Sequence, residues 1–118
     1  MLTPRHRALT LTELVRWDGR TYLLGIEFGR DGRPLDVRLT GARTGAEMEA
    51  LADDACALIS GQLQRGAAPG DLDGRLHPDG AAPASLIGAV VRHLATVAPA
   101  LADPVRLAYA CAHGAGRG

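Results

Sequence analysis

The chain of 118 residues contains no lysine: all of its 13 basic residues are arginine, and 13 acidic residues balance them. A Walker-type phosphate loop requires a lysine, so this class of nucleotide site is excluded. A chain with no net charge also lacks the basic surplus that binds nucleic acid or an anionic membrane. We therefore expect neither a nucleic-acid partner nor a membrane partner.

Aromatic residues make up only 3% of the sequence, so the core must be built from aliphatic side chains. Two cysteines, Cys56 and Cys111, are too few for the disulfide framework of a small secreted domain. No apolar run reaches about 18 residues, and the N-terminus lacks the apolar region of a signal peptide. These absences favour a cytoplasmic protein without a membrane span.

The length fits one domain, and 47% hydrophobic with 22% charged residues is an ordinary globular composition. The distribution of patterned segments predicts an N-terminal tail at 1–8 and a single domain at 9–103. The remaining residues, 104–118, are expected to form a C-terminal tail with room for one short element.

Two Asp-Gly pairs, Asp18-Gly19 and Asp31-Gly32, predict two-residue hairpin loops, because a type I′ turn needs positive φ at both central residues. These loops would pair Trp17 with Arg20, Val15 with Tyr22, Leu11 with Ile26, Phe28 with Leu35, Ile26 with Val37, and Leu24 with Leu39. One face of the sheet then collects the apolar side chains Val15, Trp17, Tyr22, Leu24, Ile26, Phe28, Leu35, Val37 and Leu39. The other face carries Arg16, Thr21, Glu27, Asp36, Arg38 and Thr40, as in a sheet with one solvated side. Glu13 falls on the apolar face, which indicates a bulge or slip in the first strand.

Two helices are predicted after the strands. Thr44 and Glu47 have the spacing of a capping box, and a stripe of apolar residues follows at three- and four-residue steps: Met48, Leu51, Ala52, Ala55, Leu58, Ile59 and Leu63. A second stripe begins near Ser85 and ends at Pro99. The fold class is therefore α+β, a three-stranded antiparallel meander with two main helices packed on one face.

The search for chemistry gives no catalytic residue. Cys111 and His113 form the only close pair of soft metal ligands, whereas structural zinc sites use two such pairs. Cys56 has no His or Arg within one helical turn to lower its pKa, so we expect a small buried side chain. Glu49 and Asp53 share a helix face, where a solvated surface is the simpler interpretation.

Several segments carry a family resemblance in the correct order: 32–37 (GRPLDV), 49–60 (EALADDACALIS), Arg65-Gly66 with Pro69, 83–87 (PASLI) and 92–94 (RHL). They resemble the strand, the central helix and the final helix of the TSCPD domain. This domain closes many adenosylcobalamin-dependent ribonucleotide reductases and also occurs as short stand-alone proteins. The resemblance covers roughly two thirds of the chain.

The chain departs from the family at its signature, Thr-Ser-Cys-Pro-Asp. The corresponding stretch, 75–79 (RLHPD), keeps only the Pro-Asp and has His77 where the family has cysteine. The reductases also commonly end in a cysteine pair, whereas this chain has the single Cys111 near its end. A thiol or metal function of the signature cysteine is therefore not expected here.

The resemblance implies a non-catalytic interaction module in nucleotide metabolism or DNA replication. A chain of this size has no room for the barrel that ribonucleotide reduction needs, and it would bind no cofactor itself, although the reductases use adenosylcobalamin. Its partner would be a protein, either a ribonucleotide reductase chain or a second copy of itself. The candidate contact residues are Arg33, Arg38, Arg43, His77, Asp79, Arg92 and His93.

Two alternatives remain open. A reductase-related subunit could bind nucleotide, with Arg33, Arg38 and Arg43 holding a phosphate on one side of the sheet. A small thiol or zinc module could instead be built on Cys56, Cys111 and His113.

Overall fold

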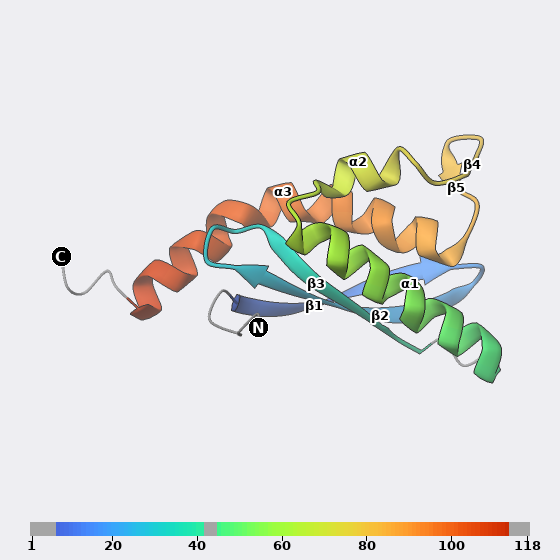
Figure 1. Ribbon diagram of the computed structural model, residues 1–118, viewed down its shortest axis with the longest axis horizontal. Coiled ribbons are helices and arrows are strands. Elements are labelled where there is room, and N and C mark those ends of the chain that lie inside the picture. Colours follow the sequence, from blue (N-terminus) through green and yellow to red (C-terminus); the bar gives the residue numbers. More distant parts are fainter. Residues whose placement is uncertain (1–6, 42–44, 114–118) are drawn as a thin grey trace.

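The computed structural model describes residues 7–41 and 45–113, with the side chains of 7, 8, 46, 79 and 108–113 excepted. Three antiparallel strands form the sheet in the order β1-β2-β3: β1 (Arg7–Trp17), β2 (Arg20–Gly29) and β3 (Pro34–Thr40). Two long helices, α1 (Ala46–Gln64) and α3 (Leu86–His113), cover one face of this sheet (Figure 1). Between them lie the short α2 (Pro69–Asp73) and a small hairpin of β4 (Pro78–Asp79) and β5 (Ala82–Pro83). The α+β class and the meander are thus confirmed.

The first hairpin has the predicted turn. Asp18 has φ 52° and Gly19 has φ 75°, so both central residues are left-handed, as a type I′ turn requires. The expected pairs of Val15 with Tyr22 and of Trp17 with Arg20 are present, as is the pair of Leu11 with Ile26. The first strand does contain a register shift, but it lies between Arg7 and Leu9, whereas Glu13 stays in register opposite Leu24.

The second hairpin differs from the prediction. Gly32 donates to the carbonyl of Gly29 (2.9 Å), and Gly29 donates to the carbonyl of Arg33 (2.8 Å), which closes a three-residue loop with Gly32 at φ 85°. A turn followed by a left-handed glycine adds one residue to one strand as a bulge. Phe28 therefore faces Pro34 instead of Leu35, while Ile26 and Val37 keep the predicted pairing.

The core lies between the sheet and the two long helices. Leu24, Ile26 and Phe28 of β2 are completely buried, and they pack with Val90 and Leu94 of α3. Apart from Leu35, every side chain assigned to the apolar face joins this cluster. The alternation of the strands therefore selects the buried face correctly wherever the register holds.

Helix α1 buries a narrower stripe than the sequence predicts. Ala52, Cys56, Ile59 and Leu63 are buried, whereas Met48, Leu51 and Leu58 are exposed. The reason is its position over β3, which is an edge strand and offers less surface than the centre of the sheet.

The capping-box prediction for α1 is also corrected: the N-cap is Gly45, without a side-chain cap hydrogen bond, and Thr44 lies outside the described residues.

The same helix protects the outer edge of β3. The Ser60 hydroxyl accepts a hydrogen bond from the Val37 N–H (3.0 Å) and donates one to the Val37 carbonyl (3.4 Å). The Gln64 side-chain amide donates to the Leu35 carbonyl (3.2 Å). These contacts satisfy backbone groups that an edge strand otherwise presents to other chains.

Helix α3 continues past Pro99, where the sequence predicted its end, and also past Pro104. Each proline removes one backbone N–H from the helix. Tertiary packing compensates, because Val105 is 1% exposed and belongs to the core cluster, and the backbone of Ala102 lies against Gly32 of the second hairpin. A segment assigned to the C-terminal tail therefore contributes to the core.

Within α3, the stretch Leu86–Leu107 is long and apolar enough, by length and composition, to cross a membrane, with a mean hydropathy of 1.3. The expectation that no such stretch exists is thus corrected. Val90, Val91 and Leu94 are nonetheless packed in the core, and the stretch also carries Arg92 and Arg106. We therefore interpret α3 as the core helix of a globular domain.

Candidate functional site

Of the predicted contact residues, Arg92 joins three elements of the fold. Its Nε lies 3.2 Å from Asp73 Oδ1 in α2, and its Nη1 donates to the Ala81 carbonyl (2.6 Å) in the β4–β5 loop. A guanidinium forms such divergent hydrogen bonds because its donors are held in a planar fork. Arg92 therefore holds α2 and the small hairpin against α3.

His93 also has an internal partner. Its Nε2 lies 3.1 Å from Oε1 of Glu13 in β1, and both side chains are about one third exposed. This contact explains why Glu13 stays in register on the apolar face of the sheet, because its carboxylate finds a partner in the helix above. Both adjacent residues of the predicted contact surface are thus used inside the fold.

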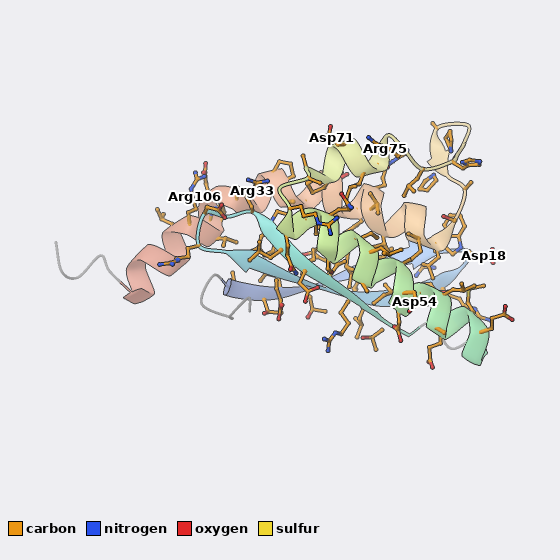
Figure 2. All side chains as sticks on the ribbon, viewed as in Figure 1. Asp18, Arg33, Asp54, Asp71, Arg75 and Arg106 are labelled. Carbon is orange, nitrogen blue, oxygen red and sulfur yellow. The ribbon has the colours of Figure 1, made fainter. Side chains whose placement is uncertain are left out.

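Of the three arginines proposed to hold a phosphate, the two that the structure describes, Arg33 and Arg38, are not brought together. Arg33, at the β2–β3 turn (Figure 2), donates from Nη2 to the Gly66 carbonyl at the end of α1 (2.7 Å), on the helix side of the sheet. Arg38 lies between the inward-facing Val37 and Leu39 of β3, so strand alternation places it on the opposite side. Arg43 lies outside the described residues.

His77 and Asp79 belong to the small hairpin. The His77 carbonyl accepts from the Ala84 N–H (3.1 Å), and Asp79 pairs with Ala82. The His77 side chain is exposed, and the Asp79 side chain lies outside the described residues. Figure 1 shows the hairpin on the helix side of the molecule, away from the other face of the sheet.

The hypothesis of a thiol module requires a reactive cysteine, but the Cys56 thiol is buried. Cys56 is 4% exposed in α1, and burial raises the pKa of its thiol above the ordinary value of 9.0. The thiol is therefore protonated at neutral pH, which is the unreactive form. The side chains of Cys111 and His113 lie outside the described residues, and the described side chains contain no group of three metal ligands.

The face of the sheet that no described helix covers is less polar than predicted. Leu14 and Leu23 are paired across β1 and β2 and are 62% and 45% exposed. Around them the register places Thr12, Arg16, Thr21, Gly25, Arg38 and Thr40, and these residues together with the two leucines form what we call the open sheet face. Arg38 is exposed, and its side chain makes no hydrogen bond or ion pair with another described residue.

The two exposed leucines were missed in the sequence, although a signal was present. Residues 14 and 23 lie one position away from the inward-facing Val15, Tyr22 and Leu24, so the predicted register already places them outside. No sequence pattern indicated the role of Ser60, because its hydrogen bonds with Val37 depend on the docking of α1 at the edge of β3.

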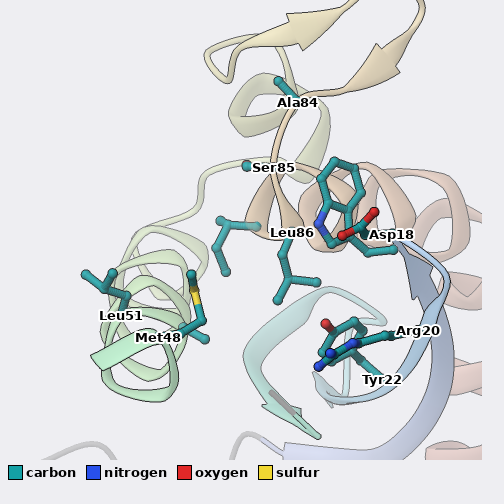
Figure 3. A pocket seen from close by; sticks show the side chains of 11 residues that line it. Asp18, Arg20, Tyr22, Met48, Leu51, Ala84, Ser85 and Leu86 are labelled. Carbon is teal, nitrogen blue, oxygen red and sulfur yellow. The ribbon is translucent and has the colours of Figure 1, made fainter. Parts of the chain in front are cut away.

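A cavity of about 480 Å³ lies on the helix side, between the β1–β2 turn, the first half of α1 and the start of α3 (Figure 3). Its walls combine the apolar side chains of Met48, Leu51 and Leu86 with the polar groups of Arg20 and Tyr22. None of the predicted contact residues whose side chains the structure describes lines the cavity. It lies on the other side of the sheet from the open sheet face.

Comparison with known proteins adds no relative: no protein-family model, curated protein or solved structure matches the chain. The resemblance to the TSCPD domain therefore stays a hypothesis.

Proposed function

We propose that the chain is a non-catalytic protein-interaction module whose open sheet face docks a partner protein. The observation that carries this proposal is the exposed pair Leu14–Leu23 at the centre of a sheet face that no described helix covers. Apolar side chains grouped within a polar rim are typical of protein contact sites. The described residues contain no constellation that we would assign to catalysis.

The partner should present an apolar patch with a carboxylate beside it. The patch would cover Leu14 and Leu23, and the carboxylate would reach the guanidinium of Arg38, which has no described partner of its own. Arg16 is less available, because its Nη1 donates to the Thr21 hydroxyl (3.0 Å). An arginine that pairs with a carboxylate at an interface contributes mainly to orientation and specificity.

The sequence resemblance supplies a particular partner, a chain of an adenosylcobalamin-dependent ribonucleotide reductase from the same organism. In this proposal the module acts in the cytoplasm as an accessory domain in nucleotide metabolism. It binds no cofactor itself. A second copy of the chain is the competing occupant, because β1 is an edge strand beside the same face.

The direct test measures the affinity of the purified chain for that reductase chain by biolayer interferometry. The double variant Leu14→Gln/Leu23→Gln should weaken the complex by about tenfold or more, since central apolar residues dominate binding energy. Arg38→Ala should weaken it less. Leu58→Gln is the matched control, because Leu58 is a 73% exposed leucine of α1 outside the open sheet face.

An absence of binding by the unmodified chain would reject the reductase as the partner. Equal affinity in the double variant and the Leu58→Gln control would reject the surface. Sedimentation equilibrium of the chain alone distinguishes the competing occupant: a dimer that the double variant dissociates would assign the open sheet face to self-association.

A further inference from the structure

The cavity beside the β1–β2 turn combines an apolar wall with several polar groups that have no partner among the described residues. Its volume of about 480 Å³ falls within the range of small-molecule sites. Met48 and Leu51 of α1 form one side, and Leu86 and Ile87 of α3 form another. In Figure 3, Met48 and Leu86 lie on opposite sides of the cavity, and Tyr22 lies below them.

Tyr22 is the first polar group without a partner. The residue is 5% exposed, and its hydroxyl forms no hydrogen bond with any described residue. Although the residue is almost buried, its hydroxyl oxygen is not among the enclosed side-chain atoms that lack a partner in the described part of the chain, so this oxygen is open to the cavity. Figure 3 shows its oxygen on the side of the ring that faces Leu86. The hydroxyl is therefore directed into the cavity, where a ligand atom can reach it.

The N-terminus of α3 supplies a second group. Ser85 caps the helix, since its hydroxyl accepts from the Gly88 N–H (2.9 Å) and its carbonyl from the Ala89 N–H (2.9 Å). The N–H groups of Leu86 and Ile87 have no acceptor among the described residues, and both residues line the cavity. The first N–H groups of a helix attract an anion through their dipoles.

Arg20 provides the positive charge. It lies two residues before Tyr22 on β2, so its side chain leaves the sheet on the same face, and it makes no ion pair with a described residue. Among the described residues that line the cavity, Asp18 is the one acidic residue, and it lies in the exposed β1–β2 turn. Its negative charge disfavours a dianion, so a ligand with a single acid group fits better.

From these groups we infer that the cavity is a binding site for a small monocarboxylic acid with an apolar body. The carboxylate is held by the N-terminus of α3, Arg20 and the Tyr22 hydroxyl, and the apolar body lies against Met48 and Leu51. This site is independent of the proposed docking function, because it lies on the opposite side of the sheet.

The test records ¹H–¹⁵N spectra of the full chain during titration with benzoate, 3-phenylpropanoate and hexanoate. Small ligands of this size bind weakly, so saturation is expected at roughly millimolar concentration. The amide signals of Leu86 and Ile87 should shift with at least one of the acids. The corresponding neutral amides, benzamide, 3-phenylpropanamide and hexanamide, should bind about tenfold more weakly, since hydrogen bonds to charged groups are the stronger ones.

Two variants assign the binding to the named groups. Arg20→Gln and Tyr22→Phe should each weaken the best acid several-fold. Arg65→Gln, which removes an exposed arginine at the end of α1, should not. No saturable shift of Leu86 or Ile87 with any acid up to about 20 mM would overturn the inference. Equal affinity for an acid and its amide, or equal affinity of the Arg20→Gln and Arg65→Gln variants, would overturn it as well.

Discussion

Glu13 and His93 meet at 3.1 Å although 80 residues separate them in the sequence. The contact joins β1 to α3 at the boundary of the core, where both side chains are only partly exposed. It is the described side-chain hydrogen bond with the largest sequence separation, and it therefore reports on the docking of α3 against the sheet.

The first prediction concerns this pair. A double-mutant cycle with Glu13→Gln and His93→Gln should give a coupling of about 0.5–1 kcal/mol in the free energy of unfolding, measured by urea denaturation. The exposed pair Asp103–Arg106 in α3 is the control and should couple more weakly, since solvent screens it. Equal coupling energies in the two cycles would show that partial burial does not strengthen the Glu13–His93 interaction.

The second prediction concerns Ser60. Ser60→Ala leaves the buried N–H and carbonyl of Val37 without their described partner. The free energy of unfolding should therefore fall by about 1–3 kcal/mol. Gln64→Ala removes an exposed hydrogen bond to Leu35 and should cost less than about 0.5 kcal/mol. Chemical denaturation of both variants provides the comparison. A Ser60→Ala protein as stable as the Gln64→Ala protein would contradict the protective role of α1.

The third prediction compares two turn glycines. Both have positive φ, but a Cβ at Gly32 would approach the Ala102 carbonyl oxygen to 2.3 Å, whereas nothing lies within 4 Å of a Cβ at Gly19. Gly19→Ala should cost about 1 kcal/mol from backbone strain alone, and Gly32→Ala should cost clearly more. Thermal melting of the two variants tests the order. The reverse order would mean that the second hairpin does not pack against α3 as described.

The fourth prediction is a pH dependence. Burial raises the pKa of Cys56 above 9.0, with smaller raising contributions from Asp53 and Asp36 and an opposing hydrogen bond at the Leu39 backbone. Above about pH 9 the unfolded chain loses this proton while the folded chain keeps it, so stability falls as pH rises. The stability advantage of the unmodified chain over Cys56→Ala should therefore shrink between about pH 7 and pH 10 in urea denaturation. A constant difference would show that the thiol titrates normally in the fold.

Local sequence signals predicted much of this fold. The Asp-Gly pair at 18–19 fixed the first hairpin, and the alternation around Ile26 selected the core face. The second Asp-Gly pair failed as a two-residue turn. There the chain forms a bulge, with Asp31 accepting a hydrogen bond from the Arg33 N–H (3.0 Å). One dipeptide is compatible with both loops, so the sequence alone does not choose between them.

The end of α3 and the candidate surfaces depended on tertiary contacts. Pro99 is a sound local stop signal, but packing of Val105 in the core outweighs it. Arg92 and His93 were read as surface contacts because their partners, Asp73 and Glu13, are distant in sequence. The cavity required three separate segments to meet, and no single motif encodes that arrangement.

The order of the elements along the chain has a consequence for biosynthesis. The three strands are synthesised before the helices of this domain, and their apolar face has no cover from these helices until α1 and then Val90 and Leu94 of α3 have been made. A nascent chain that ends before residue 90 thus presents Leu24, Ile26 and Phe28 to solvent on one side. A chaperone that binds the nascent chain would be most useful in this interval, because exposed apolar surface and strand edges promote aggregation. Synthesis of α3 completes the helical cover over this apolar face.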